Sequence, residues 1–106
     1  MSWRVQFAPE ALDELDAIED YIAHAGSSVV AVRYVDAIVA YCESLSTFLE
    51  RGIRRDDLLP GLRITNYRRN AVIAFAADPS AETVTILGVF YGGRDYEAVL
   101  QDDLGG

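Results

Sequence analysis

The chain has 106 residues, enough for one domain with one hydrophobic core and too few for a separate cofactor-binding module. An apolar content of 51 % excludes a disordered chain, and no apolar run reaches the roughly 18 residues of a membrane span, so we expect no membrane association. The net charge of −8 gives no long-range attraction to nucleic acid, so we expect no specific DNA binding by this chain alone.

The charges are unevenly distributed along the chain. Residues 1–26 contain six acids and one arginine, whereas residues 51–70 contain six arginines and two aspartates, a local charge of +4. All nine basic residues of the chain are arginine. The planar guanidinium group binds carboxylates or phosphates through paired hydrogen bonds. The composition therefore favours a protein partner.

The N-terminal segment and the cysteine content bear on the cellular compartment. The first residues lack the apolar core of a signal peptide, and the single cysteine, Cys42, cannot form an internal disulfide. We therefore expect a cytoplasmic protein in which Cys42 is a small core residue.

The first half of the chain predicts one strand and two helices. Residues 3–7 alternate apolar and polar side chains, as a half-buried strand does. Pro9 is tolerated in the first turn of a helix that Gly26 ends, and the serines that follow can cap a second helix, which we expect to run to Gly52. The apolar stripes of the two helices consist of Ala11, Leu15, Ile18 and Ile22, and of Ala31, Val35, Ile38, Cys42, Leu45 and Leu49.

The second half predicts a charged connector over residues 51–61, three strands and a short helix within residues 95–104. The strands are Leu62–Tyr67, Ala71–Ala76 and Thr83–Tyr91, joined by turns at residues 68–70 and 78–82. We expect one domain over residues 1–106, with the order β-α-α-β-β-β. It is an α+β fold in which an antiparallel sheet packs against an N-terminal αα-hairpin.

No familiar catalytic or metal-binding arrangement is evident. His24 is the only histidine, and its place near the end of a helix is favoured by the helix dipole alone. One histidine and one cysteine match no metal-ligand spacing, and Gly92-Gly93 lacks the Lys-Ser/Thr of a phosphate loop. We expect no metal, no cofactor and no catalytic residue.

The arginines near the predicted sheet are the best remaining candidates for function. Arg63, Arg69 and Arg94 fall within strands or at their ends. They could stabilise a phosphoryl transition state, pair with an acidic partner segment, or form a solvated face with weak ion pairs. Tyr91 and Tyr96 leave the same alternatives open, because tyrosines are common both at interfaces and at sheet edges.

The chain resembles the RelE/ParE superfamily of bacterial toxins, and most closely its ParE branch. The resemblance covers nearly the whole chain and rests on the order of several local motifs. These motifs are Phe7–Ala11, Leu15–Ala23, Leu58–Arg63, Ala71–Phe75 and Val84–Glu97.

The resemblance implies the toxin of a type II toxin–antitoxin system. A ParD-like antitoxin would neutralise it in a hetero-oligomer, and the free toxin would inhibit DNA gyrase and block replication by binding, without enzymatic activity. The residues expected to contact the antitoxin or the target are Arg54, Arg55, Arg63, Arg69, Tyr91, Arg94 and Tyr96.

The RelE branch implies an alternative, a ribosome-dependent endoribonuclease that cleaves messenger RNA without metal. Arg69 falls where that branch carries an arginine, and Arg63, Arg94 and Tyr91 or Tyr96 would assist. However, the position after the last strand, basic in the ribonucleases, is Gly92, and the late tyrosine site is Ala98. The acidic net charge also departs from the ribonucleases, so we rank the ParE reading first. A family member that serves only as a binding module is a third possibility.

Overall fold

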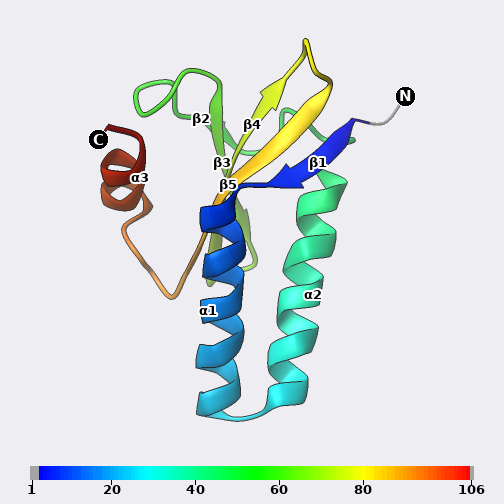
Figure 1. Cartoon of the computed structure of the whole chain (residues 1–106), viewed down its shortest axis with the longest axis vertical. Helices are drawn as coiled ribbons and strands as arrows, with labels where there is room; N and C mark the ends of the chain where they lie inside the picture. Colours follow the sequence, from blue (N-terminus) through cyan, green and yellow to red (C-terminus); the bar gives the residue numbers. More distant parts are fainter. Residues whose placement is uncertain (1–2, 106) are drawn as a thin grey trace.

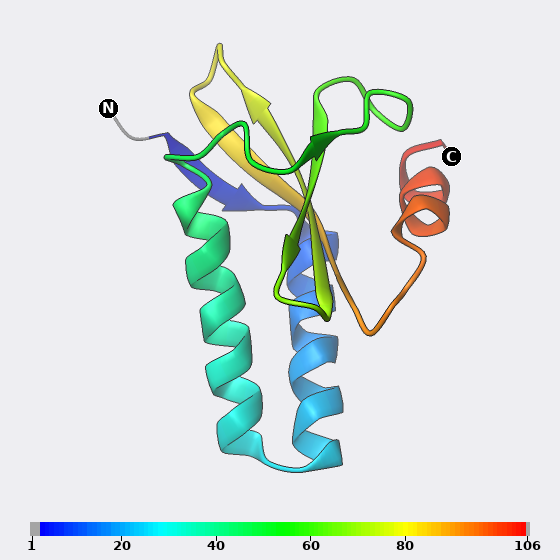
Figure 2. The same ribbon diagram turned by 180° about the vertical axis from the view of Figure 1, so that it is seen from behind.

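The computed structural model describes the backbone of residues 3–105 and the side chains of residues 3–100. Two long helices form a hairpin that packs on one face of a five-stranded sheet and extends beyond it, and a short C-terminal helix lies on the other side (Figures 1 and 2). The elements are β1 (Arg4–Phe7), α1 (Pro9–Ala25), α2 (Ser28–Ser44), β2 (Ile53–Arg54), β3 (Leu62–Tyr67), β4 (Ala71–Asp78), β5 (Thr83–Tyr91) and α3 (Tyr96–Gly105).

The sheet has the strand order β1-β5-β4-β3-β2 and is antiparallel except at one edge. The α+β class and the order of the main elements are as predicted, but β1 pairs with β5 in parallel, with Arg4 opposite Thr83 and Phe7 opposite Ile86. Parallel neighbours need a long crossover. Here the helical hairpin and the β2–β4 meander supply it, because β1 and β5 lie at opposite ends of the sequence.

The helical hairpin begins as predicted but ends earlier. Pro9 stands in the first turn of α1, Gly26 follows its last residue, and Ser27 Oγ accepts a hydrogen bond of 3.3 Å from the Val30 amide at the start of α2. The prediction that the second helix runs to Gly52 is wrong, because α2 ends at Ser44.

Hydrogen bonds from two serine side chains to backbone carbonyls explain the early end of α2. Ser44 Oγ donates to the Tyr41 carbonyl at 2.5 Å, and Ser46 Oγ donates to the Glu43 carbonyl at 2.9 Å. The amides of the last turn bond three residues back, as from Thr47 to Ser44 at 3.0 Å. Serines that bond to nearby carbonyls compete with the helical ladder, and they turn the chain here before Leu49.

The charged connector contains a strand that its sequence did not reveal. Ile53 pairs with Ile64 and Arg54 with Arg63, which makes β2 a two-residue edge strand. Gly52 precedes it with φ of 82°, and a side chain there would approach the Ile64 carbonyl oxygen to 2.2 Å. Gly52 thus allows the chain to come close to β3 and does not end a helix.

The other strands lie close to where the sequence predicted them. β3 and β5 have the predicted bounds, and β4 continues two residues past Ala76 to Asp78, whose Oδ1 accepts a 3.0 Å hydrogen bond from the Ser80 amide. A bulge shifts the register, since Ala74 faces Gly88 whereas Phe75 faces Ile86.

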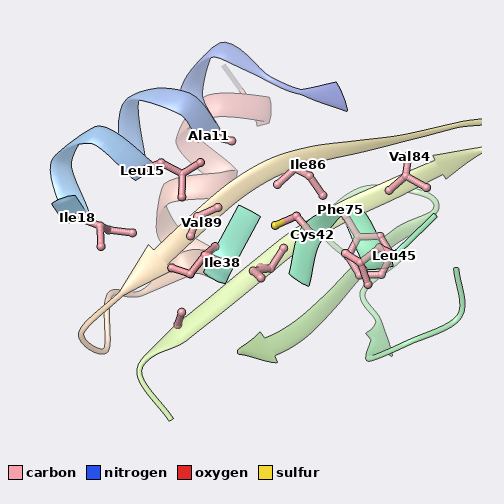
Figure 3. Packing of buried hydrophobic residues seen from close by; sticks show 12 residues of the cluster. Ala11, Leu15, Ile18, Ile38, Cys42, Leu45, Phe75, Val84, Ile86 and Val89 are labelled. Atoms are coloured by element: carbon pink, nitrogen blue, oxygen red, sulfur yellow. The ribbon is translucent and has the colours of Figure 1, made fainter. Parts of the chain in front are cut away.

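Two hydrophobic clusters cover the two faces of the sheet. The larger lies between the hairpin and the sheet, and Figure 3 shows its side chains from α1 and α2 meeting those of β4 and β5. Cys42 is fully buried within it, as predicted. The smaller cluster lies under α3, and its buried members are Leu62, Ile64, Ala74, Phe90 and Leu100.

Candidate functional site

The seven residues expected to bind a partner occupy two regions of the sheet. Arg54, Arg55, Arg63 and Tyr96 lie around β2 and the start of α3, whereas Arg69, Tyr91 and Arg94 lie where β3, β4 and β5 turn or end. Tyr67 is the last residue of β3, next to the turn that contains Arg69, and it is four residues from Arg63, which corresponds to ~13 Å along the strand. The length of β3 therefore separates Arg63 from the region that contains Arg69.

Arg55 holds together three segments of the chain. Its Nε and Nη2 donate to the two carboxylate oxygens of Asp57 at 2.9 and 2.8 Å, its Nη2 also donates to Glu97 at 2.6 Å, and its Nη1 donates to the Tyr96 hydroxyl at 2.9 Å. These bonds raise the pKa of Arg55 above its usual range and lower the pKa of Asp57, chiefly through the hydrogen bond between the two side chains. Arg55 and Tyr96 thus fasten α3 to the β2–β3 connection.

Arg54 and Arg63 also have partners within the chain. Arg54 forms a 3.0 Å salt bridge with Asp56, and both side chains are well exposed. Arg63 Nη1 donates to the Glu50 carbonyl at 2.9 Å, which ties the segment before β2 to β3. Because the Arg54 pair is exposed, it holds the guanidinium only weakly.

Arg69 and Arg94 are exposed in the β3–β4 turn and the β5–α3 connection, and neither forms a salt bridge with a side chain that the structure describes. The guanidinium of Arg94 lies 5.7 Å from the centre of the Phe90 ring, within range of a cation–π contact. Gly92, whose amide donates to the Asn70 carbonyl at 2.9 Å, joins the two loops. These two arginines are placed to meet an external anion.

Five of the six tyrosines form a continuous row, which we call the tyrosine array. It runs through Tyr21, Tyr91, Tyr34, Tyr67 and Tyr41, with successive ring centres 6.0, 5.6, 6.1 and 5.2 Å apart. Three members come from α1 and α2 and two from the ends of β3 and β5, so the array joins the hairpin to the sheet. Most of these ring pairs are edge-to-face, as aromatic packing favours.

Arginines flank the tyrosine array. The Arg68 guanidinium lies 5.2 Å from the centre of the Tyr67 ring, and the Arg51 guanidinium lies 5.4 Å from that of Tyr41 and 4.6 Å from that of Phe48. The array as a unit was not predicted from the sequence. The seven-residue spacing of Tyr34 and Tyr41 on one helical face was the available signal.

Burial affects two titratable groups of α2, Tyr34 in the array and Cys42 in the core. Burial, followed by the proximity of Tyr91 and Tyr67, raises the pKa of Tyr34, whose hydroxyl is buried and bonds to no described group. Burial also raises the pKa of Cys42 to about 12.

His24 lies apart near the end of α1, with Nδ1 2.7 Å from the Asp20 carbonyl oxygen. Within residues 3–100, no group of three or more histidine, cysteine or carboxylate side chains is arranged to hold a metal.

A cavity of about 300 Å³ opens beside one end of the array, between α1 and the end of β5. Glu14 lies at its wall, where Oε1 accepts a 2.8 Å hydrogen bond from the Val89 amide and holds α1 against β5. The lining residues are Glu14, Ala17, Ile18, Tyr21, Tyr91, Gly92 and Arg94. Two of the predicted binding residues, Tyr91 and Arg94, thus share one site.

A comparison with protein-family models decides the family. The model described as the ParE toxin of the type II toxin–antitoxin system parDE matches residues 5–96. The chain belongs to the ParE toxin family. The toxin assignment that the sequence resemblance implied is thereby confirmed.

Solved structures share the fold. A chain of the chromosomal ParDE toxin–antitoxin system from P. aeruginosa is 22 % identical, with a TM-score of 0.72 over 86 % of this chain and 97 % of the other. A chain of the RelBE2 toxin–antitoxin complex from Mycobacterium tuberculosis is also 22 % identical, with a TM-score of 0.62 over 86 % and 99 %. The isolated E. coli RelE toxin is 16 % identical, with a TM-score of 0.54 over 97 % and 100 %.

Two further findings are negative. No curated protein matches the chain. Among the helices that the structure describes, none has the length and apolar character that crossing a membrane requires.

Proposed function

We propose that this ParE-family toxin acts by binding, that its target is DNA gyrase, and that a ParD-like antitoxin neutralises it in a cytoplasmic hetero-oligomer. The family assignment supports the toxin role, and the ParDE and RelBE2 proteins that share the fold are described as members of toxin–antitoxin systems. The gyrase target rests on the family alone.

The observation that carries the binding mechanism is the placement of the exposed Arg69 and Arg94 near Tyr91, a member of the tyrosine array. Aromatic rings and guanidinium groups are the side chains most enriched at the energetic centres of protein interfaces. Arg69, Tyr91 and Arg94 stand together at this surface, and of the seven predicted residues we assign these three to partner contact. Arg54 is an accessory contact, while Arg55, Arg63 and Tyr96 keep the surface in shape through their bonds within the chain.

The arrangement offers little to a ribonuclease. Cleavage by general acid and base needs two groups poised near neutral pH within reach of one another. The Tyr96 hydroxyl accepts a hydrogen bond from Arg55, and Arg63 is engaged by the Glu50 carbonyl away from Arg69. We therefore propose a toxin without enzymatic activity.

A supercoiling assay tests the proposed target. Purified toxin should inhibit gyrase supercoiling of relaxed plasmid, and the cognate antitoxin should relieve that inhibition. The cognate antitoxin is identified as the protein whose co-expression restores growth to cells that produce the toxin. Normal supercoiling at toxin concentrations well above that of gyrase would exclude gyrase as the target, and growth arrest that no neighbouring gene relieves would exclude the antitoxin.

A further inference from the structure

The cavity between α1 and the end of β5 has apolar walls and an opening to solvent. Ile18 is a buried residue of its lining, while Tyr21 is 65 % exposed and places its ring 6.0 Å from that of Tyr91. A volume of about 300 Å³ is at the lower limit for ligand pockets. It is small for a cofactor and well sized for one large apolar side chain.

A single guanidinium lies at the rim of this cavity. Arg94 is exposed and forms no ion pair with any side chain within residues 3–100, although it contacts the Phe90 ring. The other charged wall residue, Glu14, bonds to the Val89 amide, so its oxygen is directed at the backbone of β5. The cavity therefore offers an apolar space with a cation at its rim, and with the carboxylate of Glu14 bonded to β5 in its wall.

The backbone beside the cavity leaves room for another chain. Gly92 and Gly93 have φ of 73° and 81°, and a Cβ added to either would meet no atom within 4 Å. In both views the β5–α3 connection passes beside α1 without a further element outside it (Figures 1 and 2). In addition, β1 pairs with β5 only as far as Ile86, so the last part of β5 has no strand on that side.

We infer that this cavity receives one large apolar side chain from an acidic segment of a partner protein, and that a carboxylate next to that side chain pairs with Arg94. The occupant is the antitoxin, so this inference rests on the proposed function. It adds to that function the site at which the partner is anchored and the chemistry that the site recognises.

Charge complementarity on the sheet side of the cavity argues for an acidic partner. The Gly92 amide donates to the Asn70 carbonyl, so the exposed Arg68 and Arg69 of the β3–β4 turn belong to the same end of the sheet as Arg94. An acidic segment is therefore attracted on this side and repelled by the exposed aspartates of α1, such as Asp13 and Asp20. Such a pattern fixes the register of a docked chain more than it adds affinity. The apolar side chain supplies the burial that makes the contact stable.

Calorimetric titration of the toxin with the cognate antitoxin tests the inference. Tyr21→Ala removes one wall, Ala17→Trp fills the space, and Arg94→Gln removes the charge while keeping the size of the side chain similar. Each change should weaken binding at least tenfold, and the affinity of Arg94→Gln should depend less on salt than that of the wild type. Ala40→Trp on exposed α2 and Arg4→Gln in β1 are matched controls and should remain within twofold of the wild type.

The outcomes separate the inference from the proposed function. Tight binding by the wild type together with unchanged binding by both Tyr21→Ala and Ala17→Trp would overturn the inference and leave the function standing. Absence of binding by the wild type would overturn both. If the toxin alone self-associates in sedimentation equilibrium and Ala17→Trp makes it monomeric, the occupant is a second copy of this chain and the inference is wrong. Melting curves by circular dichroism must first show that each variant is folded.

Discussion

Single residues of this toxin divide into those that bind within the chain and those that face outward. Arg55 belongs to the first kind, because its guanidinium donates to Asp57, Glu97 and Tyr96 at once. Arg69 and Arg94 belong to the second. Residue type alone did not distinguish them, since all are arginines close to strands. The difference comes from which acids the fold brings near, and that depends on α3 reaching the β2–β3 connection.

The carboxyl of Asp57 should report the Arg55 contact directly. Its pKa lies below the usual value of 3.8 because Arg55 donates to it. A lowered pKa means that this contact is present at neutral pH and is lost as the pH falls below about 4. NMR titration should find that Arg55→Gln brings the pKa of Asp57 back toward the usual value.

Arg54→Gln is the control for that titration, because Arg54 pairs with Asp56. It should leave the pKa of Asp57 lowered. An Asp57 carboxyl that titrates identically in the wild type and in Arg55→Gln would show that the two side chains do not interact in solution.

Removing the hydroxyl of Tyr34 and removing that of Tyr41 should affect the free energy of unfolding differently. The buried hydroxyl of Tyr34 bonds to no described group, whereas that of Tyr41 lies 2.9 Å from Thr65 Oγ1. Tyr34→Phe should therefore leave the free energy of unfolding unchanged or raise it, and Tyr41→Phe should lower it by about 1 kcal/mol. Urea unfolding measures both. A larger loss from Tyr34→Phe than from Tyr41→Phe would contradict the assignment.

At the scale of elements, the alternation of side chains in the first strand and the helical spacing of apolar residues predicted which face of each of these elements is buried. β3 and β5 have the predicted bounds because the turn residues at 68–70 and 78–82 mark where the strands end and begin. The end of α2 was wrong because the apolar stripe continues through Leu45 and Leu49, while Ser44 and Ser46 bond to backbone carbonyls. β2 consists of two exposed residues, which are too few for an alternating pattern of burial. It is recognised only from its pairing with β3.

The candidate site was predictable in composition and not in geometry. Tyr91 and Arg94 were expected at a strand end, and they lie at the cavity as neighbours. Their partner Tyr21 is on α1, about 70 positions earlier, and nothing local in the sequence joins it to them. The tyrosine array likewise depends on how the hairpin crosses the sheet.

Replacing Gly52 with alanine should destabilise the protein more than replacing a glycine of similar conformation that has no close neighbour. Alanine at Gly52 would bring a Cβ to 2.2 Å from the Ile64 carbonyl oxygen, and Gly61 has nearly the same φ but nothing within 4 Å. Gly61→Ala should lower the free energy of unfolding by roughly 1–2 kcal/mol through backbone conformation alone. Gly52→Ala should lower it further, because β2 must separate from β3. Equal losses in urea unfolding would show that the close approach does not matter.

At the scale of the whole molecule, the protein is acidic but carries arginines in two exposed regions of the sheet. Arg54 and Arg69 lie in the two arginine regions and are both exposed. Replacing both with Glu should weaken binding to the cognate antitoxin more than tenfold, because carboxylates of the partner would then meet like charges. Arg55 is left intact because its loss would release α3.

The control for this charge reversal is Arg33→Glu combined with Arg4→Glu, which changes the net charge equally on α2 and β1. Binding by the control should stay within threefold of the wild type in the same titration. Equal weakening by both pairs would mean that net charge, and not the placement of Arg54 and Arg69, governs the affinity.

The claim that this toxin binds and does not cleave is tested most directly by incubating purified toxin with translating ribosomes. Intact message should be recovered even when each toxin molecule has had time for many turnovers, while the same preparation inhibits gyrase supercoiling. Message cut at defined sites by the wild type and left intact by Arg69→Ala would contradict the account and establish a ribonuclease.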